Sequence, residues 1–202
     1  MTSERLPAQL AFLREADKLK GILRHSRVTF AARRENDAEH SWHLALAAMI
    51  LAEYAEPGLD LLRTIEMVLI HDLVEIDAGD TIAYASDAAK AAQAERERAA
   101  AERLFGLLPA DQGSRLRALF GEFEQRRTRE ARFARALDRV QPILQNLHSH
   151  GAAWRANGVT AQMVRDLNEP IIRDASPALW QRMEGLIAEA EANGCFPAPD
   201  AP

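Results

Sequence analysis

The sequence predicts an all-α protein folded as one helical bundle. Alanine, leucine, arginine and glutamate dominate its 202 residues and are strong helix formers, whereas β-branched runs are scarce. Apolar residues recur at intervals of three and four, and short breaks containing proline or glycine separate the segments. The sequence has no internal repeat and no long linker, and a chain of this length can bury one full core. We therefore expect one domain over residues 1–193, followed by a short flexible tail over residues 194–202.

The first helix is expected between Pro7 and Lys20, where leucines recur on one side and Gly21 ends the pattern. The segment 22–34 that follows fits neither period, because its β-like run at residues 28–30 is too short to assign as a strand. A second helix begins at Asn36 or Asp37, either of which can cap it, and runs to about residue 54. Its buried side is expected to contain Trp42, Ala45, Leu46, Met49 and Ile50.

Caps and breaks define the remaining helices. Asp60 can cap a third helix over residues 61–76, which the turn at residues 77–81 ends. Pro142 interrupts the apolar pattern of a later helix and should kink it rather than end it. A serine cap followed by proline opens the last helix at Ser176-Pro177. The later helices are expected over residues 86–108, 109–125, 128–147, 160–168 and 176–193.

Composition narrows the cellular setting and the class of partner. The net charge of −5 gives no general attraction to nucleic acid or to an anionic membrane. Cys195 is the single cysteine, so no internal disulfide can form, as is usual in a reducing compartment. The sequence contains neither a signal-peptide core nor an apolar run of the roughly 20 residues that span a bilayer. We expect a cytoplasmic protein with a small-molecule partner, without nucleic-acid or membrane partners.

The most informative stretch is the apolar run of residues 68–75, which contains His71 and Asp72 and ends at Glu75. Burying a carboxylate without a partner costs several kcal/mol, so such groups are usually paired or bound to a metal. The His-Asp pair alone is weak evidence, since a histidine near a helix end often only hydrogen-bonds a neighbour. It gains weight if further ligands occur on other apolar helices.

Two such candidates exist. His40 lies near the start of the second helix, and the short turn after that helix brings it beside the end of the third, where His71 and Asp72 lie. Asp138 is an acidic residue within another apolar helix face and could supply a fourth ligand. Imidazole nitrogen together with carboxylate oxygen suits Mn, Fe, Co, Zn or Ni rather than Ca. We therefore expect one divalent transition metal at the centre of the bundle, with Mg also possible. His43 shares the face of His40, but we expect it to support the site rather than to bind the ion.

These residues, in this order, resemble the signature of a known family. The order His40…His71-Asp72…Asp138 is similar to the H…HD…D signature of the HD-domain metal-dependent phosphohydrolases. The segments 19–24, 33–41 and 71–80 resemble the 5'-deoxynucleotidase branch of that family. The resemblance covers roughly residues 10 to 150 and leaves out the last two helices.

The resemblance implies a role for seven residues. His40, His71, Asp72 and Asp138 match the metal ligands. Glu75 matches an acid that positions or activates the attacking water, and Asp80 a second acid beside the scissile phosphate. Arg24 matches a basic group that binds the phosphate or sugar. The implied activity is hydrolysis of 5'-deoxynucleoside monophosphates to deoxynucleoside and phosphate.

Several alternatives remain open at this level. His25 and the segment Thr81-Ile82-Ala83-Tyr84 depart from the bacterial pattern, so the nucleotide preference is unsettled. A nucleoside triphosphate or a guanosine polyphosphate is a second substrate class, and a non-catalytic binding protein of the same fold is a third reading. Glu75 and Arg24 have ordinary readings as a surface acid and a salt-bridged arginine, and Asp80 as part of a turn.

The resemblance also implies a homodimer. Apolar positions on the expected helices over residues 109–125 and 176–193 could form the interface.

Overall fold

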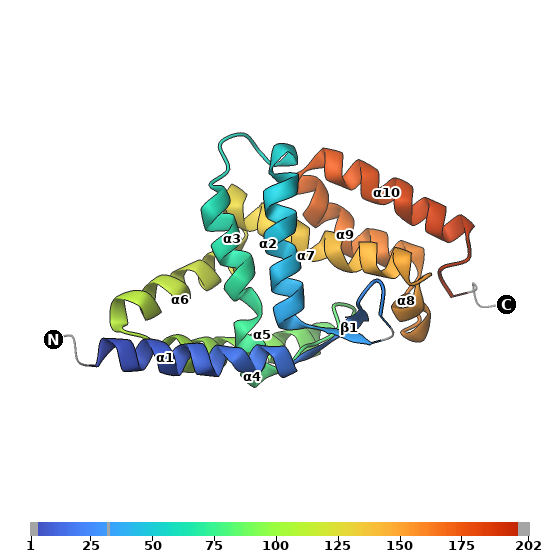
Figure 1. Cartoon of the computed structure of the whole chain (residues 1–202). Coiled ribbons are helices and arrows are strands. Elements are labelled where there is room, and N and C mark those ends of the chain that lie inside the picture. The colour runs from blue at the N-terminus through green and yellow to red at the C-terminus, as the bar shows by residue number, and fades with distance from the viewer. Residues whose placement is uncertain (1–3, 32, 198–202) are drawn as a thin grey trace.

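A computed structural model describes residues 4–31 and 33–197 as a bundle of helices with one small hairpin (Figure 1). The prediction of an all-α fold is therefore confirmed for the body of the chain. The α-helices of the described residues are α1 (Arg5–Ala16), α2 (Asp37–Leu51), α3 (Leu61–Ile70), α4 (Glu75–Ala78), α5 (Asp87–Phe105), α6 (Ala110–Gln125), α7 (Arg129–His148), α8 (Ala152–Ala156), α9 (Ala161–Ala175) and α10 (Pro177–Ala192). Short 3₁₀ segments are η1 (Asp17–Gly21), η2 (Ala52–Tyr54) and η3 (His71–Val74).

Helix α7 is the centre of the bundle. Helices α2 and α3 stand side by side against it, while α9 packs on its other side and α10 packs on α9 (Figure 1). The larger core surrounds α7, whose Phe133, Leu137 and Val140 are almost fully buried. A smaller core lies between α1, η3 and α5. Within the described ranges, no helix combines the length and the apolarity needed to cross a membrane.

A two-stranded antiparallel hairpin follows η1 and was not predicted. Strand β1 (Leu23–Arg27) pairs with β2 (Arg34–Asn36). The sequence of β1 is mostly polar, so it lacks the usual strand signal. Side chains alternate across a strand, and here Arg24 and Ser26 are turned toward the protein while their neighbours are exposed. The hairpin therefore aims Arg24 at the centre of the bundle.

The second helix begins as expected but buries a different side. The Asn36 side chain accepts a hydrogen bond from the Glu39 amide, and the Glu39 carboxylate accepts one from the Asn36 amide, forming a capping box. The buried stripe consists of Asp37, His40, Ser41, Leu44 and Ala48. The expectation for Trp42, Leu46, Met49 and Ile50 was wrong, because these side chains are 41% to 65% exposed. The helix is apolar on nearly all sides, so spacing alone could not identify the buried face.

The expected helix over residues 61–76 is divided into three parts. Asp60 caps α3 by accepting from the Arg63 amide, as predicted. The helix then changes to 3₁₀ geometry in η3 at His71–Val74, which precedes the single turn of α4. Gly79 ends α4 with φ +72°, a conformation that favours glycine. A 3₁₀ stretch within a helix often marks a functional segment.

The C-terminal region also differs from expectation. Helix α9 continues through Pro170 to Ala175 rather than ending near residue 168, and its Ile172 is fully buried. The flexible tail was expected to begin at residue 194, yet Cys195 and Phe196 are buried. Phe196 stacks on Trp154 with ring centroids 4.5 Å apart. The expected tail is therefore packed against α8 as far as residue 196, and residues 198–202 lie outside the described residues.

Candidate metal centre

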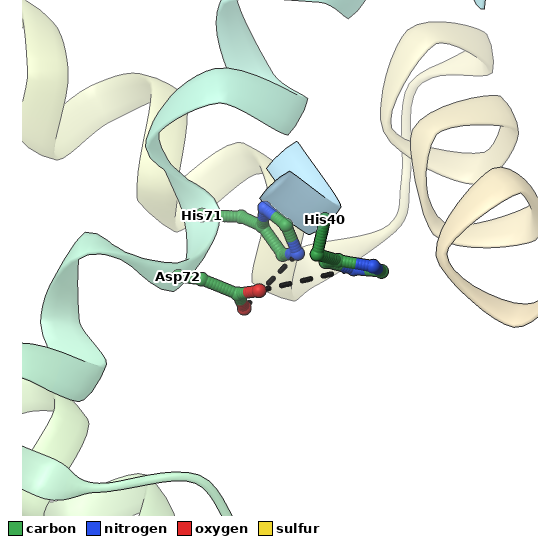
Figure 2. Close-up of side chains that lie close together, drawn as sticks. All are labelled: His40, His71 and Asp72. Atoms are coloured by element: carbon green, nitrogen blue, oxygen red, sulfur yellow. Dashed lines mark ion pairs between the residues drawn. The ribbon is translucent and has the colours of Figure 1, made fainter. Parts of the chain in front are cut away.

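The four residues expected to bind a metal converge from three elements. His40 comes from the first turn of α2, His71 and Asp72 from η3, and Asp138 from the middle of α7. All four are buried, with relative exposures of 0% to 7%. Figure 2 shows the Asp72 carboxylate beside both imidazole rings, with dashed lines to His71 and to His40. Their roles as ligands remain predictions, but the structure places them together.

The carboxylate oxygens surround the Nε2 atoms of both histidines. Asp138 Oδ1 lies 3.1 Å from His40 Nε2 and 3.8 Å from His71 Nε2. Asp72 Oδ1 lies 3.0 Å from His71 Nε2, and Asp72 Oδ2 lies 3.8 Å from His40 Nε2. His40, His71 and Asp72 thus offer ligand atoms within 4.8 Å of one another, and Asp138 Oδ1 lies beside the two nitrogens.

The opposite edge of each ring is held by an oxygen acceptor. His71 Nδ1 lies 3.0 Å from the Val68 carbonyl oxygen, and His40 Nδ1 lies 3.1 Å from the Gln141 amide oxygen. In the neutral form of each ring, Nδ1 can therefore carry the proton and donate it, which leaves Nε2 with its lone pair facing the carboxylates. This arrangement is usual for metal-binding histidines, whose second nitrogen is oriented by an oxygen.

The electrostatic environment shifts the pKa values of the two histidines in opposite directions. Burial and the nearby Arg24 lower the pKa of His40 to about 4. Burial also acts to lower the pKa of His71, but Asp72 and Asp138 outweigh it and raise that pKa to about 10. Despite burial, the His71 charge and Arg24 hold the pKa of Asp72 below its ordinary value. The neutral His40 and the two ionised aspartates are in the protonation states that ligands require.

The donor set fits a divalent ion. His40, His71 and Asp72 each offer a ligand atom within 4.8 Å of the others. His71 Nε2 is buried and makes no hydrogen bond within the described residues, although Asp72 is close. Such an unpartnered buried nitrogen beside two carboxylates is satisfied by a cation. Nitrogen and oxygen donors of this kind suit first-row transition metals.

Arg24 reaches this cluster from β1. Its Nη1 donates to Asp72 Oδ2 at 2.8 Å and to Asp37 Oδ1 at 3.3 Å. Burial acts to lower the pKa of Arg24, but Asp72, Asp138 and other carboxylates outweigh it and raise that pKa. Its Nη2 lies 3.9 Å from Asp138 Oδ1 and makes no hydrogen bond among the described residues. Arg24 is therefore a fixed cation beside the expected metal position.

Glu75 lies at the start of α4 and faces the same cluster. Its carboxylate, with those of Asp37 and Asp72, offers oxygens within 4.8 Å of one another. Burial and the charges of Asp72 and Asp37 raise the pKa of Glu75 to about 12. Burial and Asp72 also raise the pKa of Asp37, to about 7. Glu75 Oε2 and Asp37 Oδ2 have no hydrogen-bond partner in the described part of the chain.

Asp80 lies in the loop after α4, at the edge of the site. Its Oδ2 accepts a hydrogen bond from the His25 amide at 3.1 Å, which ties the loop to β1. Gln93 of α5 fixes the other side of this loop by donating to the Gly79 carbonyl oxygen at 2.7 Å. Asp80 lines the same cavity as Glu75 and Arg24.

Sequence reasoning missed several residues of the site. Asp37 was considered only as a helix cap, yet it is fully buried beside Arg24. Glu35 is 2% exposed and accepts hydrogen bonds from Gln141 at 2.7 Å and from Gln145 at 2.6 Å. Gln141 lies three residues after Asp138, on the same helix face, and that spacing could have identified it.

Two arginines of α7 were also missed. Arg135 Nη1 donates to Asp138 Oδ2 at 3.2 Å, and Arg139 Nε lies 3.9 Å from the same oxygen. Burial and the charge of Arg135 lower the pKa of Arg139 to about 10. Asp138 therefore faces the imidazoles with Oδ1 and two cations with Oδ2.

A cavity of about 240 Å³ opens beside the cluster. The metal-facing residues His71, Asp72 and Asp138 form one part of its wall, together with Arg24 and Glu75. Its volume is near the lower end of small-molecule sites, which begin at about 300 Å³. The site therefore combines a buried polar cluster with a space for a small anionic ligand.

Comparisons with known proteins agree with this geometry. A family model described as HD domain matches residues 16–180. A crystal structure of a predicted metal-dependent phosphohydrolase from Magnetospirillum magnetotacticum MS-1 is similar to this chain, with 49% identity and a TM-score of 0.91. That similarity covers 97% of each chain. An HD-domain phosphohydrolase from Listeria innocua shares the fold at 17% identity, with a TM-score of 0.63 over 92% of this chain and 99% of the other.

The similar curated proteins share one name. The human 5'-deoxynucleotidase HDDC2 is 33% identical over 137 residues, which cover 67% of this chain and 65% of the human protein. The Xenopus laevis 5'-deoxynucleotidase HDDC2 is 37% identical over 113 residues, which cover 56% of this chain and 54% of that protein. The chain thus spans less than two thirds of the length of these relatives.

Proposed function

This chain belongs to the HD-domain family, and on that premise we propose that it is a metal-dependent phosphohydrolase acting on 5'-deoxynucleoside monophosphates. The observation that carries the proposal is the convergence of two histidine Nε2 atoms and two aspartates at the wall of a small-molecule cavity. The similarity to proteins named 5'-deoxynucleotidase supports the substrate class.

His40, His71, Asp72 and Asp138 would hold the ion. We propose Mn, Co, Fe, Ni or Zn, with Mg as a weaker candidate, because two imidazoles favour the softer ions. When bound, such an ion lowers the pKa of a water and polarises the phosphoryl oxygens. Gln141 and the Val68 carbonyl group fix the two imidazoles in the orientation this requires.

Glu75 would act on the attacking water. The water oxygen forms a bond to phosphorus, the bond from phosphorus to O5' breaks, and the water proton ends on the leaving oxygen. Glu75 lies within 4.8 Å of Asp72 through its carboxylate oxygens, close enough to hold the water and accept its proton. Burial and the charge of Asp72 disfavour its ionised form, and a bound cation would offset this.

The arginines would neutralise the phosphate. Arg24 Nη2 makes no hydrogen bond among the described residues and lines the cavity, so it retains donors for a phosphate oxygen. Arg139 lines the same cavity, and its one ion pair among the described residues is with Asp138, whose Oδ2 lies 3.9 Å from Nε. Asp80 would lie near the leaving group or the sugar, at the edge of the site.

A substrate panel tests this proposal. Metal-loaded protein is incubated with 5'-deoxynucleoside monophosphates, 5'-ribonucleoside monophosphates, 3'-phosphate isomers, triphosphates and a guanosine polyphosphate, and phosphate release is measured. We expect turnover of the 5'-deoxynucleoside monophosphates above all others. Cleavage confined to triphosphates or polyphosphates would assign the protein to that substrate class instead. If no compound of the panel released phosphate, a non-catalytic binding protein would be favoured.

We also propose a homodimer, with an interface different from the one expected from sequence. The exposed large apolar side chains of the described residues do not come from α6 or α10, which were expected to supply it. They lie mainly on α1, where Leu6, Leu10 and Leu13 are 56% to 62% exposed, and on α2. We place the interface on the α2 face, where Trp42, Met49 and Ile50 are 64%, 59% and 65% exposed. Sedimentation analysis of the wild type and of Ile50→Glu tests this. A dimer that the substitution converts to monomer supports the α2 face, and a dimer that persists contradicts it.

A further inference from the structure

The cavity extends well beyond the metal-facing residues. One face of α7 forms its floor, since the lining residues follow helical spacing: Arg135, Asp138, Arg139, Pro142, Ile143 and Asn146. The eight steps from Asp138 to Asn146 correspond to about 12 Å along a helix. The cavity therefore continues from the metal cluster toward α8, which packs against α7 and β1, and toward α9, which packs against α7 (Figure 1).

Charge is distributed unevenly along this cavity. Its charged lining residues come from β1, η3, α4, the following loop, α5, α6 and the part of α7 that ends at Arg139. In the described ranges, no charged residue from α8, from α9 or from the part of α7 beyond Arg139 lines it. We call that part the neutral end, formed by Tyr84, Ile143, Trp154, Val159, Leu167 and Asn168.

The neutral end has fixed aromatic and amide walls. Trp154 is 3% exposed, and its ring is held by stacking on Phe196 at an interplanar angle of 14°. Its backbone N–H donates to Asn146 Oδ1 at 3.3 Å, which fixes α8 to α7. Asn168 is 3% exposed and donates from Nδ2 to the Val164 carbonyl oxygen at 2.7 Å. The wall is therefore set before any ligand binds.

Tyr84 completes this end from the loop after α4. It packs against the larger core and lies close enough to Asn168 to interact with it. The loop is anchored by Gln93, which also accepts a hydrogen bond from Thr81 Oγ1 at 3.0 Å. Tyrosine and tryptophan present flat apolar surfaces, while the tyrosine hydroxyl and the asparagine amide are directional polar groups.

We propose that the neutral end receives the nucleobase of the substrate, an inference that rests on the proposed phosphohydrolase function. The phosphate lies at the arginines and the metal cluster, and the uncharged base lies further along α7, toward Ile143 and Asn146. Aromatic walls with a few fixed polar atoms suit an uncharged planar heterocycle. A chain of further phosphates would find no cation there among the described lining residues.

Substrates with and without a base test the inference. The wild type is assayed on 2-deoxyribose 5-phosphate and on 5'-deoxynucleoside monophosphates under the same metal conditions. Stacking of a base on an aromatic side chain is worth about 1–3 kcal/mol, which corresponds to a gain of roughly fivefold to 150-fold. We expect kcat/KM for the nucleotides to exceed that for the sugar phosphate by at least about tenfold.

Variants locate this preference at the neutral end. Leu167→Trp adds bulk to a half-buried lining residue, and we expect the nucleotide-to-sugar-phosphate ratio to fall at least about tenfold. Met163→Trp, one turn earlier on α9 and outside the cavity lining, is the matched control and should keep the wild-type ratio. Tyr84→Phe, which removes only a hydroxyl, gives an independent measure if Leu167→Trp does not fold. It should change the relative rates among the bases.

The outcomes separate two kinds of failure. Equal turnover of nucleotides and sugar phosphate by the wild type overturns the nucleobase site while the proposed function stands. The nucleobase site is also overturned if Leu167→Trp keeps the wild-type nucleotide-to-sugar-phosphate ratio and Tyr84→Phe keeps the wild-type relative rates among nucleotides with different bases. If the wild type turns over neither the nucleotides nor the sugar phosphate, the proposed function itself is contradicted.

Discussion

Gln141 gives the most specific prediction about how the metal cluster is held. Its side chain is 2% exposed and connects His40 to Glu35, accepting from His40 Nδ1 at 3.1 Å and donating to Glu35 Oε1 at 2.7 Å. Gln145 donates to the same Glu35 oxygen at 2.6 Å, and no hydrogen bond joins it to His40. Leucine at either position has similar volume and removes one bond to Glu35. Only Gln141→Leu also releases His40.

The expected magnitudes follow from these contacts. Each variant removes one donor from a buried carboxylate, which costs about 1–3 kcal/mol of stability. In Gln141→Leu the next acceptor for His40 Nδ1 is Glu35 Oε2 at 3.7 Å, too far for a hydrogen bond. Loss of the group that orients a metal-binding histidine typically lowers metal affinity by about 10- to 100-fold. That corresponds to about 1.4–2.8 kcal/mol of binding free energy.

The assay is a competition titration of metal-stripped protein against a chromophoric chelator, with thermal melts of the same samples. We expect similar losses of Tm in both variants and a loss of metal affinity in Gln141→Leu alone. Wild-type affinity in a folded Gln141→Leu would refute the role of His40 as an oriented ligand. Equal affinity losses in both variants would show that Glu35, rather than the contact to His40, controls the ion.

Three further predictions concern the ligands, the water and the proton balance. Asp72→Ala should abolish both metal retention, measured by elemental analysis, and turnover, and full activity in that variant would make the site assignment wrong. Glu75→Ala should keep its metal while phosphate release falls by about 10²- to 10⁴-fold, whereas loss of metal would make Glu75 a ligand. Because the pKa of His71 is about 10 without the ion, its imidazole is protonated near neutral pH and must lose that proton to bind. Metal uptake should therefore release a proton, and affinity should rise about tenfold per pH unit up to about pH 10. Calorimetry in buffers of different ionisation enthalpy measures this, and an uptake independent of the buffer would contradict it.

The fold could be predicted where local signals decide it. The caps at Asn36 and Asp60 and the Ser176-Pro177 start lie at helix N-termini in the structure. The hairpin could not be predicted, because tertiary contacts rather than propensity hold β1: Arg34 donates to the Leu23 carbonyl oxygen, and Arg24 reaches buried carboxylates. The burial prediction for helix α2 was wrong because its buried face contains the polar site residues, while apolar side chains such as Trp42 are exposed.

The site could be predicted in part for a related reason. His71, Asp72 and Asp138 are conspicuous because they interrupt apolar runs, and the family resemblance supplied their grouping with His40. The role of Asp37 in the site could not be recognised from sequence, because an acidic residue at the start of a helix is normally interpreted as the helix cap. Arg139 and Gln145 are ordinary polar helix residues by sequence, and their inward direction depends on how α7 is rotated against its neighbours. That rotation is a property of packing, which no local pattern specifies.

The central claim is that a metal held by His40, His71, Asp72 and Asp138 enables hydrolysis of a phosphate monoester. The most direct measurement is phosphate release from a 5'-deoxynucleoside monophosphate by chelator-stripped protein, before and after adding back Mn or Co. The account predicts no release from the stripped protein and restored turnover at about one ion per chain. Equal turnover with and without the ion, or no turnover by protein with the ion bound, would contradict it.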